Sequence, residues 1–223
     1  MVKNPMDAVD SPDPQTQVMD YVPTQRDYES IIFAAMTEGL PQAAIHLIGA
    51  VRYSGLRINE VLGWQVCDVI LYPDDNSTPY FFTSISKQGR KCRVAIPMRK
   101  ELWEILKAQI GERTGGPVWP WRCAPYFLFE IKQEDGTIKR LYDIADVKVP
   151  RPFHDFRKTF KMEMKRMGLP TEVTKSMQGQ ATDSMDGWYT HFSRVDLERA
   201  VASSWSKFSP DHDQTHDQNK KGE

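Results

Sequence analysis

The sequence is poor in the features that mark secreted, zinc-binding and membrane proteins. Its three cysteines (Cys67, Cys92 and Cys123) are widely spaced and form no CxxC pair, which argues against a disulfide framework or a structural zinc site and for a reducing compartment. The longest clean apolar run is Ile31–Met36, whereas a membrane span needs about 20 residues. The N-terminus also lacks the apolar region of a secretory signal. These absences predict a cytoplasmic protein without a membrane partner.

The net charge is small, −1 at pH 7, but it is distributed unevenly. Residues 1–22 hold one lysine against four aspartates, a net of −3, and residues 209–223 carry −2. Both tails have few residues that could form a core, so we expect them to be disordered. Subtracting the tails leaves +4 on residues 23–208. Such a modestly basic body is compatible with a nucleic-acid partner but does not require one.

Residues 23–208 combine helical patterns with one β-rich region, which predicts a single mainly α domain with a small antiparallel β-sheet. Thr24 and Asp27 form a capping-box pattern at the start of the first helix. Gly39 and the Ser54-Gly55 pair are expected to end the first two helices. The helical patterns start at Thr24, Pro41 and Ile58 and cover 99–110, 153–167, 172–177 and 193–208, with 124–133 a further candidate. The strand patterns cover 66–72, 79–86 and 93–97, the last two flanking residues 87–91 as a hairpin with a basic tip.

Four short segments carry residues suited to chemistry. Taken singly, each has an ordinary structural explanation: a surface ion pair between Arg57 and Glu60, a solvated basic turn, a surface pair of His154 and Arg157, and a core aromatic at Tyr189. The four segments are Ser54–Leu62, Lys87–Arg93, His154–Arg157, and Gly179-Gln180 followed by Trp188-Tyr189-Thr190-His191.

In this order, the four segments resemble the catalytic domain of the tyrosine recombinases, the phage-integrase family. From Arg57 to Asp68 the chain matches, without gaps, that family's first box, Thr-Gly-Leu-Arg-Ile-Ser-Glu-Leu-Leu followed by an Asp. The run from His154 to Phe160 is close to the second box, His-x-Leu-Arg-His-Thr-Phe, and Tyr189 stands 35 residues after His154. The resemblance covers about residues 24–208 and implies the DNA breaking-rejoining fold of that family.

The resemblance implies a DNA strand transferase that needs neither metal nor ATP nor any other cofactor. Tyr189 would be the nucleophile, because a phosphotyrosyl ester stores the energy of the broken bond. Arg57 and Arg157 would hold the charged oxygens of the transition state, which fork-shaped guanidinium groups suit better than lysines do. His154 would act either as a hydrogen-bond donor to the phosphate or as a base toward Tyr189.

The general acid that protonates the leaving 5′-oxygen is Lys87 by the family pattern, with Lys91 as the rival. Gln180 stands where the family usually has His, and its amide can donate a hydrogen bond but cannot carry charge or a proton. The implied partner is double-stranded DNA, on which the chain would assemble as a homo-oligomer, a tetramer. The residues expected to contact DNA phosphates are Arg90, Lys91, Arg93, Lys158 and Lys161.

Two other functions stay open from the sequence. One is a DNA-binding or regulatory remnant with weak or no catalysis, which Gln180 and the short stretch of 23 residues before Thr24 favour, since family members usually carry a core-binding domain there. The other is a type IB topoisomerase-like enzyme, which relaxes DNA without exchanging strands. The complete set of Arg57, Lys87, His154, Arg157 and Tyr189 speaks against the remnant.

Overall fold

The computed structural model describes residues 21–74, 78–87, 90–122, 125, 129–148, 152–180 and 197–198, with the backbone only at 85–87, 90–92 and 152. The predicted class is confirmed, since these residues form helices and two small antiparallel sheets. The helices are α1 (Gln25–Thr37), α2 (Gln42–Ser54), α3 (Ile58–Leu62), α4 (Lys100–Ile110), α5 (Leu141–Ile144), α6 (Pro152–Arg166) and α7 (Thr171–Met177). The strands are β1 (Val69–Ile70), β2 (Tyr80–Lys87), β3 (Arg90–Pro97), β4 (Glu130–Lys132) and β5 (Ile138–Arg140).

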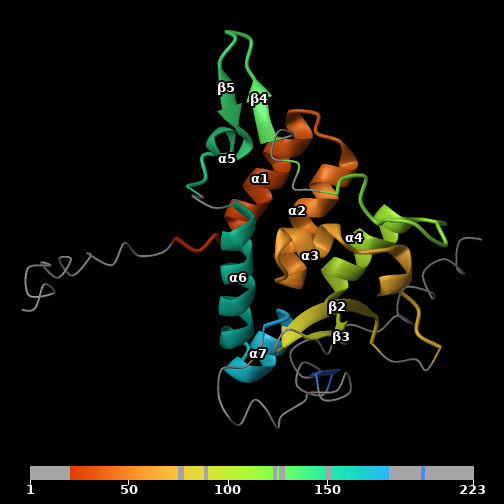
Figure 1. Ribbon diagram of the computed structural model, residues 1–223. Helices are drawn as coiled ribbons and strands as arrows, with labels where there is room; N and C mark the ends of the chain where they lie inside the picture. Colours follow the sequence, from red (N-terminus) through yellow and green to blue (C-terminus); the bar gives the residue numbers. More distant parts are fainter. Residues whose placement is uncertain are drawn as a thin grey trace, which may run out of the picture.

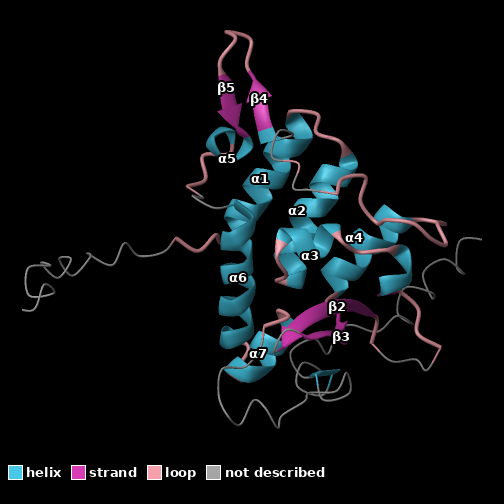
Figure 2. Ribbon diagram, in the orientation of Figure 1, coloured by secondary structure: helices cyan, strands magenta, loops and turns pink. Residues whose placement is uncertain are grey.

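Helix α2 forms the centre of the core and packs against α4 and α6. It is buried almost all round over its last two turns, from Leu47 to Ser54. Helix α6 runs down one side of the molecule, with the β4–β5 hairpin projecting at one end and α7 and the β2–β3 strands at the other (Figures 1 and 2). Within the described residues, no helix has the length and apolar character needed to span a membrane.

The start of α1 follows the predicted capping box. The hydroxyl of Thr24 accepts a hydrogen bond from the backbone N–H of Asp27 (3.2 Å), and the Asp27 carboxylate accepts one from the N–H of Thr24 (2.7 Å). These bonds satisfy donors that the first helical turn leaves free. The segment before α1 is also tied to α6, because Thr159 Oγ1 donates to the carbonyl of Pro23 (3.0 Å).

Two predicted elements differ from the structure, one in length and one in type. Residues 66–72 were expected as a strand, but Val66–Asp68 form a 3-10 turn and only Val69–Ile70 pair with β2. The reason is local: the Asp68 carboxylate accepts from the N–H of Gln65 (3.0 Å) and caps the turn. A helix was expected over 124–133, but residues 130–132 form strand β4, which pairs with β5. The two strands are joined by a turn at Asp135-Gly136, as the sequence predicted.

The basic hairpin also differs in detail from the prediction. Strands β2 and β3 continue to Lys87 and Arg90, whose Cα atoms are direct partners in the ladder, and Ser86 pairs with Lys91. The three basic residues therefore lie within the strands, and the turn between them is shorter than the five-residue tip that the sequence suggested. Residues 88–89 lie outside the described part of the chain.

Gly55 ends α2 in the left-handed region, with φ at 66°. A Cβ at this position would lie 2.4 Å from Cδ1 of Phe160, so α2 and α6 approach each other more closely here than any side chain would allow. The carbonyl of the same residue accepts a hydrogen bond from Arg157. Gly55 is therefore required by both its conformation and its contacts.

We expect Gly55→Ala to lower the free energy of unfolding by about 2 kcal/mol or more, combining left-handed strain with overpacking. Gly39→Ala is the matched control, because Gly39 has a similar φ of 69° but open space at the Cβ position. Urea unfolding of both variants separates the two costs. Equal losses in the two variants would show that the contact with Phe160 relaxes without cost.

Candidate active site

Arg157 lies on α6, one turn after His154, and only 5% of it is exposed. Its Nη1 donates to the carbonyl of Gly55 (2.9 Å), in the loop that joins α2 to α3. Its own backbone carbonyl accepts a hydrogen bond from Nε2 of the buried Gln178 (2.9 Å). The guanidinium group is thus held by the carbonyl at the end of α2, and the backbone of Arg157 is tied to the end of α7.

Arg57 is the N-cap residue of α3, and its side chain is 61% exposed. Glu60, three residues later, accepts from the backbone N–H of Arg57 (2.7 Å) and from its Nη1 (3.2 Å). The same carboxylate lies 3.7 Å from Nη1 of Arg157. Glu60 therefore bridges the two arginines that the sequence predicted to act together.

The bridging role of Glu60 was missed by sequence reasoning, which treated Arg57 and Glu60 as a candidate surface ion pair. The available signal was the three-residue spacing at a helix start, which is the spacing of a capping box. The proximity of Arg157 could not be inferred from that spacing, because α6 lies about 100 residues further along the chain.

Arg157 sits in an environment that disfavours its own charge. Burial and the positive charge of Arg57 lower the pKa of Arg157 to about 10, although the carboxylate of Glu60 opposes the shift. Its Nη2 is buried and has no hydrogen-bond partner among the described residues. A buried cation with an unused donor beside a second guanidinium is suited to binding an anionic oxygen.

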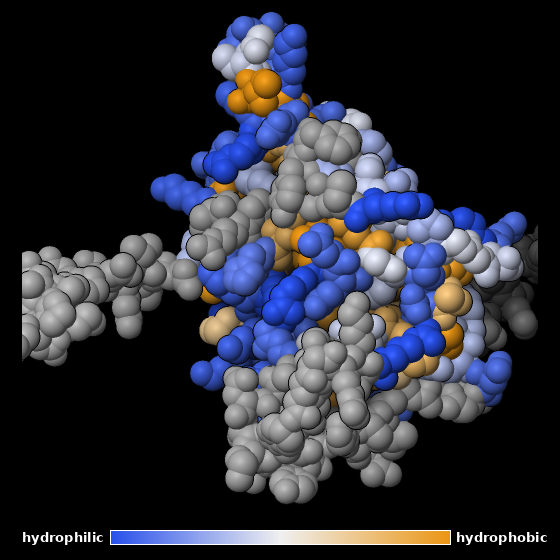
Figure 3. All heavy atoms as spheres, viewed as in Figure 1, coloured by the Kyte–Doolittle hydropathy of each residue, from blue (hydrophilic) through white to orange (hydrophobic). Residues whose placement is uncertain are grey.

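Two further predicted residues lie on the elements that hold the arginines. His154 is exposed on the first turn of α6. Gln180 is half-buried just after α7, and its backbone N–H donates to the carbonyl of Lys175 (2.8 Å). Figure 3 shows hydrophilic residues gathered on the viewed face where α6 and α3 lie. The face is therefore polar where these helices meet.

The residues predicted to contact DNA are only partly placed. Arg93 is exposed, forms an ion pair with Asp68 (2.7 Å) and lies 3.9 Å from the ring centre of Phe82. Lys158 is paired with the buried carboxylate of Asp155 (3.3 Å), and Lys161 is exposed. For Lys87, Arg90 and Lys91 only the backbone is described, so the choice of general acid stays a prediction.

The predicted nucleophile, Tyr189, lies outside the described residues, as do Val201, Trp205 and Phe208 of the predicted final helix. Tyr142 is the second tyrosine to consider as a nucleophile. It is 3% exposed in α5, where its ring lies near Phe129. Its burial in the core makes it a poor candidate for attack on a bound phosphate.

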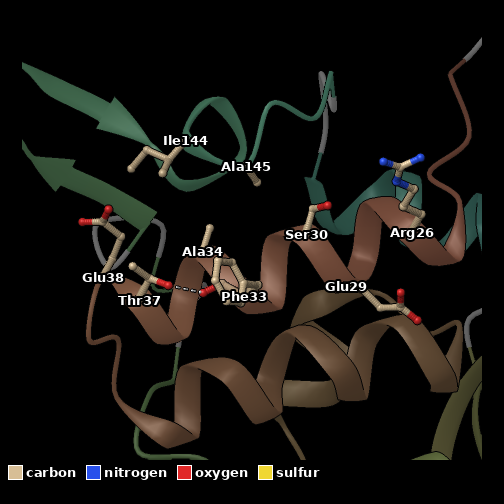
Figure 4. Close-up of a pocket in the computed structure, with 9 residues that line it drawn as sticks. All are labelled: Arg26, Glu29, Ser30, Phe33, Ala34, Thr37, Glu38, Ile144 and Ala145. Atoms are coloured by element: carbon tan, nitrogen blue, oxygen red, sulfur yellow. Dashed lines mark hydrogen bonds between the residues drawn. The ribbon is translucent and has the colours of Figure 1, made fainter.

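Two hollows differ in their relation to the arginines. A polar cleft of about 320 Å³ lies between α3 and the β2–β3 strands and includes Glu60 in its lining, with Trp64 and Arg93. Another hollow, of about 470 Å³, lies between α1 and α5 and is lined by other residues, among them Arg26, Phe33 and Ile144 (Figure 4). Among the described residues, no group of three or more His, Cys, Asp and Glu side chains is placed to hold a metal ion.

Comparisons with known proteins bear on the family and the fold of this chain. A model of the phage integrase family matches residues 22–194. An integrase of the Tn1549 transposon, solved in complex with a circular intermediate DNA, is 18% identical with a TM-score of 0.51, over 89% of this chain and 69% of that one. A lambda integrase dimer bound to a core site is 16% identical with a TM-score of 0.50, over 74% of this chain and 59% of that one.

At these identities, the likeness to the solved structures shows the fold alone. The chain spans 59–69% of the length of these two neighbours. A comparison with curated protein sequences finds no match. Since the family model covers well over half of the sequence, this chain belongs to the phage integrase family.

Proposed function

We propose that the chain is the catalytic domain of a site-specific DNA recombinase or integrase, which cuts and rejoins DNA through a 3′-phosphotyrosyl intermediate. The observation that carries this proposal is the cluster of Arg57, Glu60 and Arg157, with its unused buried donor at Arg157 Nη2. Membership of the phage integrase family supports it. A cluster of this kind suits the negative charge that develops on a phosphodiester during transfer.

In this mechanism, the hydroxyl oxygen of Tyr189 attacks the phosphorus and the bond to the 5′-oxygen breaks. The 5′-oxygen takes a proton from Lys87, or from Lys91 if that lysine is the acid. The tyrosine proton passes to His154 if that residue is the base. The attack of a 5′-hydroxyl on the phosphotyrosyl ester then restores both the tyrosine and a DNA bond, so the two transfers balance without an external energy source.

The roles of the described residues follow from their contacts. Arg157 stays protonated at neutral pH, because its pKa of about 10 lies well above 7. Glu60 holds two like charges close together and leaves their remaining donors for the non-bridging oxygens of the phosphate. Gln180 would add a neutral hydrogen-bond donor beside them.

Double-stranded DNA is the proposed substrate, and a tetramer on DNA the proposed assembly. Arg93 and the basic residues of β2–β3 would contact phosphates beside the scissile one, with Lys158 and Lys161 doing the same from α6. Because such contacts release counterions, DNA affinity should fall steeply as salt is raised.

The proposal is tested by trapping the covalent intermediate on a nicked DNA suicide substrate, in which the cleaved fragment diffuses away and religation fails. We expect a protein–DNA adduct that survives denaturation and forms equally well in EDTA. DNA binding without an adduct would instead favour the regulatory remnant. Relaxation of supercoiled DNA without strand exchange would favour the topoisomerase-like function.

A further inference from the structure

A half-buried carboxylate on α6, that of Glu163, binds two arginines that come from different parts of the chain. Glu163 accepts hydrogen bonds from both terminal nitrogens of Arg52, with Nη1 at 3.0 Å from Oε2, and from Nη1 of Arg99 at 2.7 Å. The side chain of Arg52 is fully buried, and those of Arg99 and Glu163 are 14% and 24% exposed. We call these three residues the Glu163 cluster.

The surroundings of Glu163 favour the charged form of its carboxylate. Burial alone would raise the pKa of Glu163, but the hydrogen bonds and charges of Arg52 and Arg99 outweigh it and lower that pKa. Both guanidinium groups also lie near the ring of Tyr53, at 5.2 and 5.3 Å from its centre. The carboxylate is therefore ionised at neutral pH, and its two partners are held in defined positions.

Each member of the cluster lies on a segment that carries a proposed active-site residue. Arg52 is on α2, five residues before Arg57 and three before Gly55, whose carbonyl holds Arg157. Glu163 follows Arg157 on α6 by six residues.

The third member, Arg99, connects the cluster to the hairpin. It stands at the N-cap of α4, two residues after β3 ends at Pro97. Strand β3 is paired along its whole length with β2, which carries Lys87. One carboxylate thus joins the segments that bear Arg57, Arg157 and the candidate general acid.

We infer that Glu163 is a positioning residue for the phosphate site: through Arg52 and Arg99, it sets the distance between the α2–α3 loop, α6 and the β2–β3 hairpin. The inference rests on the proposed function. The effect of the cluster on the phosphate would pass through these segments. A shift of about 1 Å in a reacting group is enough to slow a reaction by about 10²-fold.

The positioning role of Glu163 can be distinguished from a contribution of the cluster to the free energy of unfolding. A buried ion cluster is often no more stabilising than apolar residues of similar volume, because desolvation offsets its attraction. What apolar side chains do not reproduce is the directional bonding that fixes three segments relative to one another. A variant with all three members replaced by methionine can therefore remain folded while losing the geometry.

The test compares the triple variant Arg52→Met/Arg99→Met/Glu163→Met with the wild-type chain. Three quantities are measured: the free energy of unfolding, the affinity for nicked suicide DNA, and the single-turnover rate of adduct formation at saturating DNA. We expect a folded protein with affinity within about threefold of wild type and a rate lowered by about 10-fold or more. A purely structural role would leave the rate unchanged in a variant of equal stability.

Glu163→Asp is the second variant, because it keeps the charge and shortens the side chain, and it should show a smaller loss of rate at unchanged affinity. It keeps the test decisive if the triple variant does not fold. The control, Arg140→Met/Asp143→Met, removes an exposed ion pair at the start of α5 and should cleave at the wild-type rate. Wild-type rates in every folded variant would overturn the inference. Failure of the wild-type chain itself to form an adduct would overturn the proposed function, and this inference with it.

Discussion

Replacement of Tyr189 by Phe should abolish the covalent DNA adduct and leave DNA affinity within about twofold of wild type. The substitution removes one oxygen, which is the atom expected to attack the phosphorus, and keeps the ring. The arginines that would bind the phosphate, on α3 and α6, are unchanged in this variant, so binding should persist. The measurement is adduct formation on nicked suicide DNA, with affinity from a binding titration of the same substrate.

Tyr142→Phe is the matched control, because it removes a phenol oxygen from a tyrosine that is only 3% exposed. This variant should form the adduct at the wild-type rate. An adduct that persists in Tyr189→Phe would move the nucleophile elsewhere, and Tyr126 would be the next residue to replace.

The second large effect should come from the paired arginines. Arg57→Ala is expected to slow adduct formation by at least about 10²-fold, the usual loss when one donor to a developing oxyanion is removed. Because the Arg57 side chain is 61% exposed, its removal should change the free energy of unfolding little. Arg57→Lys should recover little activity, since an ammonium group lacks the fork that binds two oxygens.

Arg157→Lys should be similarly slow, and less stable, because Arg157 also bonds the carbonyl of Gly55. Arg26→Ala, at an exposed arginine on α1, serves as the control and should retain the wild-type rate. A requirement for a divalent metal ion in the wild-type reaction, or full activity in Arg57→Lys, would contradict the assignment of the arginines.

Much of the fold could be predicted because its signals are local. The capping box at Thr24 and the glycine at position 55 each fix a helix end through residues adjacent in sequence. Helix α6 is rich in charged residues, but its apolar spacing is still recognisable. Its buried positions recur every three or four residues: Phe153, Phe156, Phe160 and Met164. Elements with such signals lie where they were expected.

The β4–β5 hairpin could not be predicted because its strands are three residues each and carry little alternation. A run of that length is compatible with helix or strand, and its pairing decides which forms. The strand expected over 66–72 is shorter than predicted, because the capping bond to Asp68 favours a 3-10 turn over Val66–Asp68 and leaves only Val69–Ile70 as β1.

For the candidate site, too, local features could be predicted from the sequence and long-range contacts could not. Arg57 and Arg157 could be identified by their motifs, but the bonds that hold them span long separations in sequence. Arg52 and Glu163 are 111 residues apart and on different helices. An arginine inside the apolar pattern of α2 was the available signal, since a buried charge requires a partner, but the sequence does not say which partner.

Gly55 limits which substitutions the protein can tolerate where α2 packs on α6. Its missing side chain allows Phe160 to approach, and its carbonyl accepts a hydrogen bond from Arg157. One position therefore affects both the packing of α2 on α6 and the placement of a proposed active-site arginine. Substitutions at Phe160 that change the helix spacing must also move the carbonyl that Arg157 binds. Helix packing and the geometry of the proposed active site are therefore coupled at this crossing, where we expect few substitutions to be tolerated.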